Sequence, residues 1–395
     1  MQKTVRFLLL FLAILFVLEI ARGTIDIFLL RPWPSESIPL KFPIARGAIH
    51  VHSKYSDGSG SVSEIMEAAQ RCSLDFVILT DHNNIRARLD SVEKFWGRTL
   101  LIAGEEISTN AGHVLSIGAQ RSHYAPELND LSRLIQEIHS DSGFAFIAHP
   151  DHPRLRWKSP GFFGADGMEI INADSEWRND SPREVVDALI AELIGLPGMN
   201  YLLNTPAKNM QRWDEELRNR RMVGIGSVDA HARIKLGGER YIGFPSYQQM
   251  FGLLNTFVIL DEKLSLEQQI ARGQMVDALK RGRVFFALQS LGDATGFEFY
   301  GEYDGEIALP QDTLFCEGDS TGALRVIVPT NENLAVHLYR NGSAAKIAHS
   351  SDSRFAIRES GIYRIVVFQE RIQFPWFSRR LVPWIFSNPI FVVKG

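Results

Sequence analysis

The sequence predicts an α/β protein in which a barrel of strands and helices follows an apolar helix and precedes a small β-rich domain. From residue 47 to about residue 283, short apolar runs alternate with segments of helical period, which is typical of a parallel β/α architecture. Beyond residue 283 the helical period is lost. The expected segments are a signal peptide or signal anchor (1–24), a linker (25–46), the barrel (47–285) and a β-rich C-terminal domain (286–395).

The N-terminus has the features of an export signal. Lys3 and Arg6 precede 12 consecutive apolar residues at 7–18, a length that suits a signal-peptide core and is shorter than the roughly 20 residues of a membrane-spanning helix. The small-x-small cleavage pattern around 21–23 is poor, so an uncleaved anchor is an equal alternative. The sequence therefore predicts an exported protein, either free in the periplasm or extracellular space or in contact with the membrane through this helix.

Seven apolar runs are the expected strands of the barrel: 48–51, 76–79, 100–103, 113–117, 144–147, 168–171 and 222–227. Between the first two, Ser61 and Glu64 form a capping box that predicts a helix start. Seven strands with intervening helices favour a barrel, and an open sheet is the alternative.

The C-terminal part predicts a β-sandwich-like domain. Strand-like runs at 324–328, 334–339, 363–368 and 389–393 are separated by Gly, Asn, Asp and Pro turns. An aromatic-rich stretch at 374–386 contains Trp376 and Phe377. Such aromatic residues belong either to a core or to a surface that meets a membrane or a partner.

Composition excludes several classes of function. The chain has 42 Lys and Arg against 46 Asp and Glu, a net charge of −4, so no basic field favours nucleic acid as a partner. Cys72 and Cys316 are too few for a disulfide framework and are expected to be free. The sequence has neither a Gly-x-Ser-x-Gly elbow nor a Walker-type loop, which excludes the common serine hydrolases and nucleotide-binding folds.

Potential metal ligands lie at or near the ends of nearly all the predicted strands, which is where barrels hold their active sites. His50 and His52 are two residues apart on the first strand, so both imidazoles face the same side. The full candidate set comprises His50, His52, Asp57, His82, Glu106, His113, His149, Asp229 and His231.

This set predicts a metal centre as a group, although a lone strand histidine is more often structural. It includes six of the chain's 11 histidines and three carboxylates. Burying so many polar groups together without cations would leave costly unpaired atoms.

Six separated motifs resemble, in order, those of the PHP (polymerase and histidinol phosphatase) superfamily of metal-dependent hydrolases. They are His50-Val-His52, Ser56-Asp57-Gly58, Thr80-Asp81-His82-Asn83, Gly104-Glu-Glu106, Ala148-His149-Pro150 and Asp229-Ala-His231. The segments 47–52 and 278–285 further resemble the carbaryl-hydrolase-like (CehA/McbA) branch. The resemblance implies a distorted (β/α)7 TIM-like barrel, two or three divalent metal ions (zinc, manganese or iron) and hydrolysis of phosphoesters.

The resemblance also implies a role for each ligand. His50, His52 and Asp229 would bind the first ion, and Glu106 would bridge to a second ion held by His113 and His149. Asp57, His82 and His231 would bind the third ion. Glu106 is preferred to Glu105 because it holds the third place of Gly-x-Glu, and the catalytic set is Asp229, His231 and Glu106. Glu169 and Asn172 are either outer supports of the ligands or structural core residues.

The sequence leaves three hypotheses for the function, and in the first two the substrate is a small-molecule ester. In the first, a metal-bridged hydroxide attacks a phosphoester that Arg154 and Arg156 clamp. In the second, the same metals hydrolyse a carboxylic ester or carbamate, bound by Trp157, Phe162, Phe163 and Trp177. In the third, the chain is an exported binding module without catalytic activity.

Overall fold

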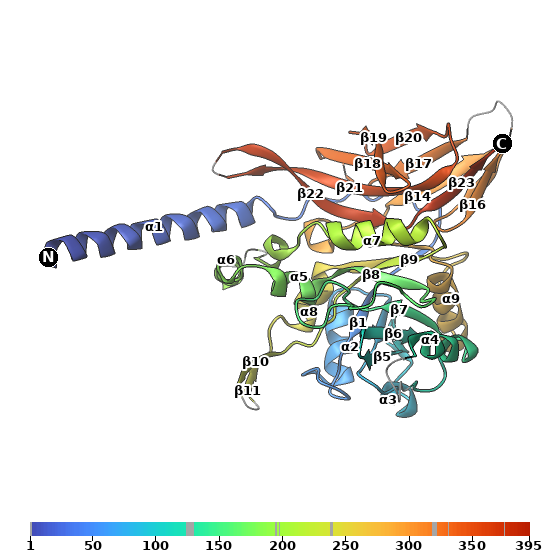
Figure 1. Ribbon diagram of the computed structural model, residues 1–395, viewed down its shortest axis with the longest axis horizontal. Helices are drawn as coiled ribbons and strands as arrows, with labels where there is room; N and C mark the ends of the chain where they lie inside the picture. The colour runs from blue at the N-terminus through green and yellow to red at the C-terminus, as the bar shows by residue number, and fades with distance from the viewer. Residues whose placement is uncertain are drawn as a thin grey trace.

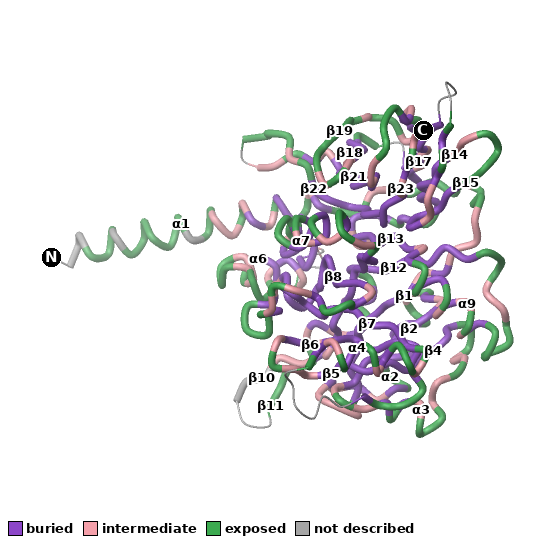
Figure 2. Tube along the Cα trace, turned by 45° about the vertical axis from the view of Figure 1, so that its right-hand side comes forward, coloured by how far each residue is buried: buried purple, intermediate pink, exposed green. Residues whose placement is uncertain are grey.

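The computed structural model describes residues 2–123, 130–193, 196, 198–237, 240–317, 322–330, 332–374 and 376–395. One body of sheets and helices makes up most of the molecule, and helix α1 (Gln2–Phe28) projects from it (Figure 1). Most described side chains of α1 before Arg22 are exposed, whereas Gly23, Asp26 and Ile27 are buried against the body (Figure 2). The expected apolar N-terminal helix is therefore present. Val5–Phe28 is long and apolar enough to cross a membrane.

The remaining helices are α2 (Val62–Arg71), α3 (Arg86–Leu89), α4 (Leu131–Ser140), α5 (Ala173–Asn179), α6 (Pro182–Leu193), α7 (Ala207–Leu217), α8 (Tyr247–Leu253) and α9 (Gln268–Lys280), with short 3₁₀ turns η1 (Gly198–Leu202) and η2 (Gln289–Leu291). α2 begins as the capping box predicts, because the Ser61 side chain accepts from Glu64 N and the Glu64 side chain accepts from Ser61 N.

The strands before residue 290 are β1 (Ile44–Val51), β2 (Phe76–Leu79), β3 (Phe95–Trp96), β4 (Thr99–Ala103), β5 (Glu105–Thr109), β6 (Gly112–Ile117), β7 (Phe144–Ile147), β8 (Gly167–Asn172), β9 (Val223–Ser227), β10 (Ile234–Gly237), β11 (Arg240–Ile242), β12 (Asn255–Ile259) and β13 (Val284–Ala287). All seven predicted strands are present with small shifts at their ends. β3, β5, β10, β11, β12 and β13 were not foreseen.

The closed TIM-like barrel expected from the sequence is not confirmed, because the described strands form separate sheets. A five-stranded sheet has the order β5-β6-β7-β8-β9, while β1, β2 and β4 belong to a second, larger sheet. The two sheets meet in isolated bridges between Val51 and Ala230 and between His82 and Glu106. The fold is a mixed α/β fold.

Antiparallel pairing explains much of the difference between the expected closed barrel and the separate sheets of the structure. β5 and β6 are joined by two residues, a connection that forces an antiparallel hairpin, since parallel strands need a long crossover. β12 likewise runs antiparallel to both β1 and β13.

The C-terminal strands are β14 (Glu298–Tyr303), β15 (Glu306–Ala308), β16 (Thr313–Cys316), β17 (Ala323–Ile327), β18 (Leu334–Arg340), β19 (Ser343–Ala348), β20 (Asp352–Ala356), β21 (Gly361–Gln373), β22 (Ser378–Ser387) and β23 (Ile390–Lys394). β13 pairs with β22, so the larger sheet continues from β1 into this region. The domain boundary at residue 285 stays a prediction. The long hairpin β21–β22 reaches toward the side from which α1 projects (Figure 1).

Candidate metal centre

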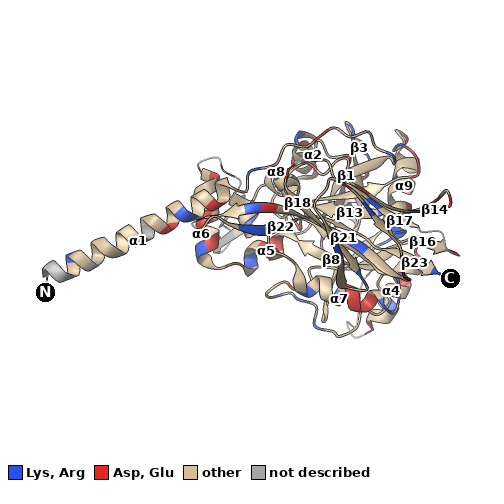
Figure 3. Ribbon diagram, turned by 90° about the horizontal axis from the view of Figure 1, so that it is seen from above, with Lys and Arg blue, Asp and Glu red and all other residues tan. Residues whose placement is uncertain are grey.

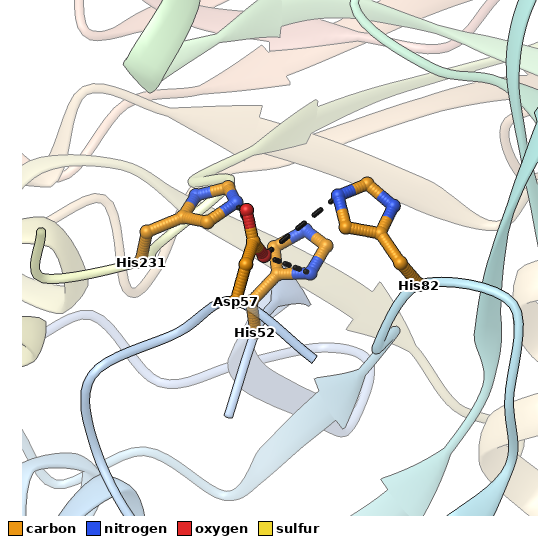
Figure 4. Close-up of side chains that lie close together, drawn as sticks. All are labelled: His52, Asp57, His82 and His231. Atoms are coloured by element: carbon orange, nitrogen blue, oxygen red, sulfur yellow. Dashed lines mark ion pairs between the residues drawn. The ribbon is translucent and has the colours of Figure 1, made fainter. Parts of the chain in front are cut away.

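The structure brings all nine candidate ligands together where the two sheets meet. They come from separate elements: His50 from β1, Glu106 from β5, His113 from β6, and the others from the segments that follow β1, β2, β7 and β9. Figure 4 shows four of them, His52, Asp57, His82 and His231, converging on one point. Three overlapping groups have geometry that could hold a metal ion.

The most buried group comprises His50, His52, Glu106 and Asp229. Glu106 Oε2 lies 3.0 Å from His50 Nε2 and 3.1 Å from His52 Nε2. Asp229 Oδ1 lies 3.3 Å from each of the same nitrogen atoms. Ligands at about 2.0–2.1 Å from a tetrahedral zinc ion stand roughly 3.3 Å apart, so these separations fit one cation.

The second group joins Glu106 to His82 and His113, and His149 also lies beside this carboxylate. Glu106 Oε1 lies 2.6 Å from His113 Nδ1 and 2.9 Å from His149 Nε2. One carboxylate therefore faces two sets of imidazoles, which is the geometry of a bridging ligand. The neighbouring Glu105 points elsewhere, since it accepts from the Ser122 hydroxyl and from His123 N.

The third group is the most open to solvent. Asp57 Oδ1 lies 3.3 Å from His231 Nε2, 3.7 Å from His82 Nε2 and 3.8 Å from His52 Nδ1. The Asp57 side chain is 46% exposed, whereas that of His52 is fully buried. An ion at this group would be the one closest to solvent.

Unsatisfied buried atoms support the fit of cations to these groups. Among the described residues, several buried ligand atoms have no hydrogen-bond partner: His50 Nε2, His52 Nε2, Asp57 Oδ1, His82 Nδ1 and Asp229 Oδ1. Buried polar atoms in folded proteins are nearly always satisfied. Convergent imidazole and carboxylate donors are the ligands that zinc, manganese and iron accept.

Strained backbone also marks this site. His50, His149 and Asp229 have φ values of 67°, 27° and 50°, a left-handed region that non-glycine residues seldom adopt. Such residues cluster at functional sites, where the surrounding structure holds them. Three of the nine ligand candidates are therefore positioned at a conformational cost.

Glu169 and Asn172 of β8 support the ligands. Glu169 Oε1 lies 2.6 Å from His50 Nδ1, and its other oxygen accepts from His149 N and from Asn172 Nδ2. Asn172 Nδ2 also lies 3.2 Å from Asp229 Oδ2. A carboxylate behind a ligating imidazole orients the ring and raises its basicity.

Opposite charges dominate the titration of the cluster. Burial opposes the charged form of His52, but the nearby carboxylates of Asp229 and Glu106 outweigh burial and raise its pKa to about 9. Burial acts likewise on Glu106, yet the charge of His50 and hydrogen bonds from His113 and His149 hold the pKa of Glu106 well below its usual range. Without metal, protons on the imidazoles thus balance the buried carboxylates.

A cavity of about 890 Å³ opens over the cluster. Arg154, Arg178 and Arg233 line it, whereas Arg156 is exposed and lies outside its lining. Of the aromatic residues considered for an ester pocket, Trp177 lines the cavity. Trp157 and Phe162 are buried in the core instead.

His152 is a cavity residue that the sequence analysis missed. Its Nδ1 accepts from Arg154 N and Leu155 N, so the neutral ring carries its proton on Nε2. Burial and the charge of His149 lower the pKa of His152 to about 4, which keeps it neutral. The one available signal was its place three residues after His149.

A known family matches the part of the chain that contains most of the candidate ligands. The profile of the PHP domain matches residues 48–159. An uncharacterised protein of Methanocaldococcus jannaschii is 31% identical over 141 residues, which are 32% of this chain and 80% of that protein.

Two solved structures are similar at low identity. One, from Bacteroides vulgatus, is a two-domain protein containing a predicted PHP-like metal-dependent phosphoesterase; it has 15% identity and a TM-score of 0.43, with 89% of this chain and 99% of that chain covered. The other, an amidohydrolase from Chromobacterium violaceum with bound sulfate, has 14% identity and a TM-score of 0.31, with 47% and 87% covered. On the strength of the matched profile and the relative from Methanocaldococcus jannaschii, the chain belongs to the PHP domain family.

Proposed function

We propose that the protein is a metal-dependent phosphoesterase that holds two or three divalent ions on the nine converging side chains. The observation that carries this proposal is the set of buried imidazole nitrogens that face Glu106 Oε2 and have no hydrogen-bond partner among the described residues: His50 Nε2, His52 Nε2 and His82 Nδ1. Divalent ions held there would lower the pKa of a water molecule and neutralise charge on the oxygens of the reacting group. Asp229, His231 and Glu106 are the proposed catalytic ligands.

Cationic side chains on the cavity wall favour a phosphoester over other esters. Arg178 is held by Asp174, whose Oδ2 lies 2.5 Å from Arg178 Nε. Arg233 donates from Nη1 to the carbonyl of Asp57, and its buried Nε has no partner among the described residues. Guanidinium groups bind phosphoryl oxygens through several parallel hydrogen bonds. Arg178 and Arg233 are thus better placed than Arg156 to hold the substrate beside the ligand cluster.

The reaction needs no nucleophile from the chain. The oxygen of water attacks phosphorus, the bond from phosphorus to the alcohol oxygen breaks, and a proton from the water reaches the departing alcohol. The Nε2–H group of His152 is a fixed donor at the cavity wall. It would orient a substrate oxygen, because a ring with so low a pKa stays neutral at physiological pH.

A carboxylic ester or carbamate hydrolase is the second candidate. Trp177, Pro182, Val185 and Ile234 give part of the same cavity an apolar wall. Such a substrate would use the metals in the same way but would gain little from the arginines. The CehA/McbA resemblance belongs to this alternative.

The test measures metal content and substrate class together. Purified full-length protein and the variant His50→Ala/His52→Ala are analysed for zinc, manganese and iron, then assayed on p-nitrophenyl phosphate and p-nitrophenyl acetate. We expect bound metal and phosphatase activity in the wild-type protein, and loss of both in the variant. His349→Ala is the control, because that exposed histidine lies outside the cluster. A folded wild-type protein that binds no metal would contradict the proposal, and acetate turnover alone would select the second candidate.

A further inference from the structure

Helix α6 lies between the metal cavity and helix α1. Pro182 and Val185 of α6 line the cavity. On another side of α6, Arg183 pairs with Glu19 of α1, and a side chain at Gly23 of α1 would collide with Asp187. The cavity and α1 are therefore separated by the width of one helix, about 10 Å.

Helix α6 carries a stripe of exposed apolar side chains. Val186, Leu189 and Leu193 are 44%, 38% and 86% exposed, and their spacing of three and four residues places them on one face. At 100° per residue, this face lies between the side that lines the cavity and the side that contacts α1. The stripe thus adjoins the side of α6 that lines the cavity.

The tip of the β21–β22 hairpin presents a second apolar surface close to α1. Trp376 and Phe377 are 85% and 69% exposed. The hairpin is tied to the base of α1, since Phe374 N donates to Asp26 Oδ1 and Arg371 donates to the carbonyl of Arg31. α6 and the hairpin β21–β22 lie toward the side from which α1 leaves, in both views (Figures 1 and 2).

A lipid bilayer is the partner that these surfaces fit. The exposed part of α1 is roughly 27–30 Å long at 1.5 Å per residue, close to the thickness of a bilayer core. Glu19 and Arg22 mark the end of its apolar run, at the level where Arg183 of α6 lies. Exposed Trp and Phe beside a membrane helix are typical of the bilayer interface. Lys/Arg and Asp/Glu are mixed around α6 and β22 (Figure 3), so apolar insertion rather than net charge would provide the contact.

We propose that the α6 stripe and the Trp376–Phe377 tip rest in the interface of the bilayer that α1 enters, and that the substrate is a phosphoester borne by a membrane lipid. In this position the cavity opens at the membrane surface, and a lipid headgroup reaches the metals without leaving the bilayer. The substrate class rests on the proposed phosphoesterase function, whereas the membrane contact does not.

The experiment uses full-length protein in phosphatidylcholine vesicles that contain phosphatidic acid as the probe. Phosphate release from this lipid is compared with turnover of soluble p-nitrophenyl phosphate. The variants Trp376→Ser/Phe377→Ser and Leu193→Ser are expected to lower the lipid rate by at least about tenfold, because each loses apolar contact with the bilayer. The soluble rate should stay unchanged. Phe315→Ser and Leu266→Ser are the controls, because they remove exposed apolar residues from β16 and from the segment before α9.

Membrane contact is read separately from catalysis. Vesicles with brominated acyl chains should quench part of the tryptophan emission of the wild-type protein. This quenched part should be absent in Trp376→Ser. Hydrolysis of the soluble probe without the lipid probe would overturn the lipid substrate and leave the phosphoesterase function intact. Hydrolysis of neither probe, with quenching retained, would overturn the proposed function. Absence of quenching would overturn the membrane contact.

Discussion

Arg178 and Arg233 line the cavity and differ from Arg88, which lies outside its lining, in what holds them. Arg178 is fastened to Asp174 and lies over the Trp177 ring, with its guanidinium carbon 4.4 Å from the ring centre. By contrast, Arg88 binds Glu93 and the carbonyl of Ala103, so its hydrogen bonds are used within the fold. A guanidinium that is positioned by the protein and still has free donors suits an anionic substrate.

Removing either cavity arginine should weaken catalysis without releasing metal. Arg178→Met and Arg233→Met are each expected to lower kcat/KM for an aryl phosphate about tenfold to a hundredfold, as loss of a charged hydrogen bond predicts. Metal content should stay at the wild-type level, since neither side chain is in the ligand set. Arg156→Met is the matched control and should leave kcat/KM unchanged. Equal effects of all three substitutions would argue against a phosphate clamp.

The connection from β8 to α5 joins a helix cap to the metal cluster. Asn172 Oδ1 accepts from Ser175 N and caps α5. Its amide nitrogen donates to Glu169 and lies near Asp229. One side chain therefore sets both the start of the helix that carries Arg178 and the position of two carboxylates.

Substitutions at Asn172 separate these two tasks. Asn172→Ala should lower the free energy of unfolding by about 1–2 kcal/mol, as loss of an N-cap does, and should also weaken metal binding. Asn172→Asp keeps the cap but places a third carboxylate beside Glu169 and Asp229, so we expect destabilisation mainly when a chelator has removed the metal.

Asp130→Ala is the control, because it removes the cap of α4. It should lower the free energy of unfolding by about 1 kcal/mol without affecting metal affinity. Urea unfolding with and without chelator measures each effect, and identical behaviour of all three variants would contradict this role.

Local sequence patterns predicted individual elements better than their pairing. The apolar run 76–79 and the Ser61–Glu64 box depend on neighbouring residues alone, and both were predicted correctly. The antiparallel strand β12 was missed, and its partner in the sheet, β1, is about 200 residues away in the sequence. Pairing depends on such distant contacts, so a closed parallel barrel was expected where separate sheets occur.

The site was predictable to the extent that its residues follow strand ends. His50, His149 and Asp229 were identified because strand ends gather at one edge of a sheet. His152 has no such marker, since its position depends on how the segment after β7 folds over the cavity. Arg154 and Arg156 were chosen as basic residues near the expected mouth of the site; Arg154 lines the cavity, whereas Arg156 is exposed and lies outside its lining.

At the scale of the whole molecule, protons and metal ions compete for the same imidazoles. Burial opposes a charge on His50, but Asp229, Glu106 and Glu169 outweigh it and raise its pKa well above the ordinary value. The pKa of His52 rises to about 9 in the same way. In the metal-free protein, these charged imidazoles stabilise the fold fully below about pH 6.5. That stabilisation is lost as the pH rises through the raised pKa values.

Metal binding should therefore stabilise the protein more at higher pH. Ligating imidazoles must be deprotonated, so metal affinity grows as the pH rises toward about 9. Over the same pH range the metal-free protein becomes less stable. The pKa values of Glu106 and Asp229 are lowered, and the stability that these carboxylates contribute is lost at acidic pH, outside this window.

The measurement is the unfolding temperature with zinc or with chelator, at several values between about pH 6.5 and about pH 8.5. We expect the unfolding temperature with zinc to exceed that with chelator by an amount that increases steadily with pH. In His50→Ala/His52→Ala the difference should be small at every pH, because the variant lacks two nitrogens of the most buried group. The prediction is contradicted if, in the wild-type protein, the unfolding temperatures with zinc and with chelator differ by an amount that stays constant or decreases as the pH rises. In that case protons do not take the place of the metal, and some other charge balances the carboxylates.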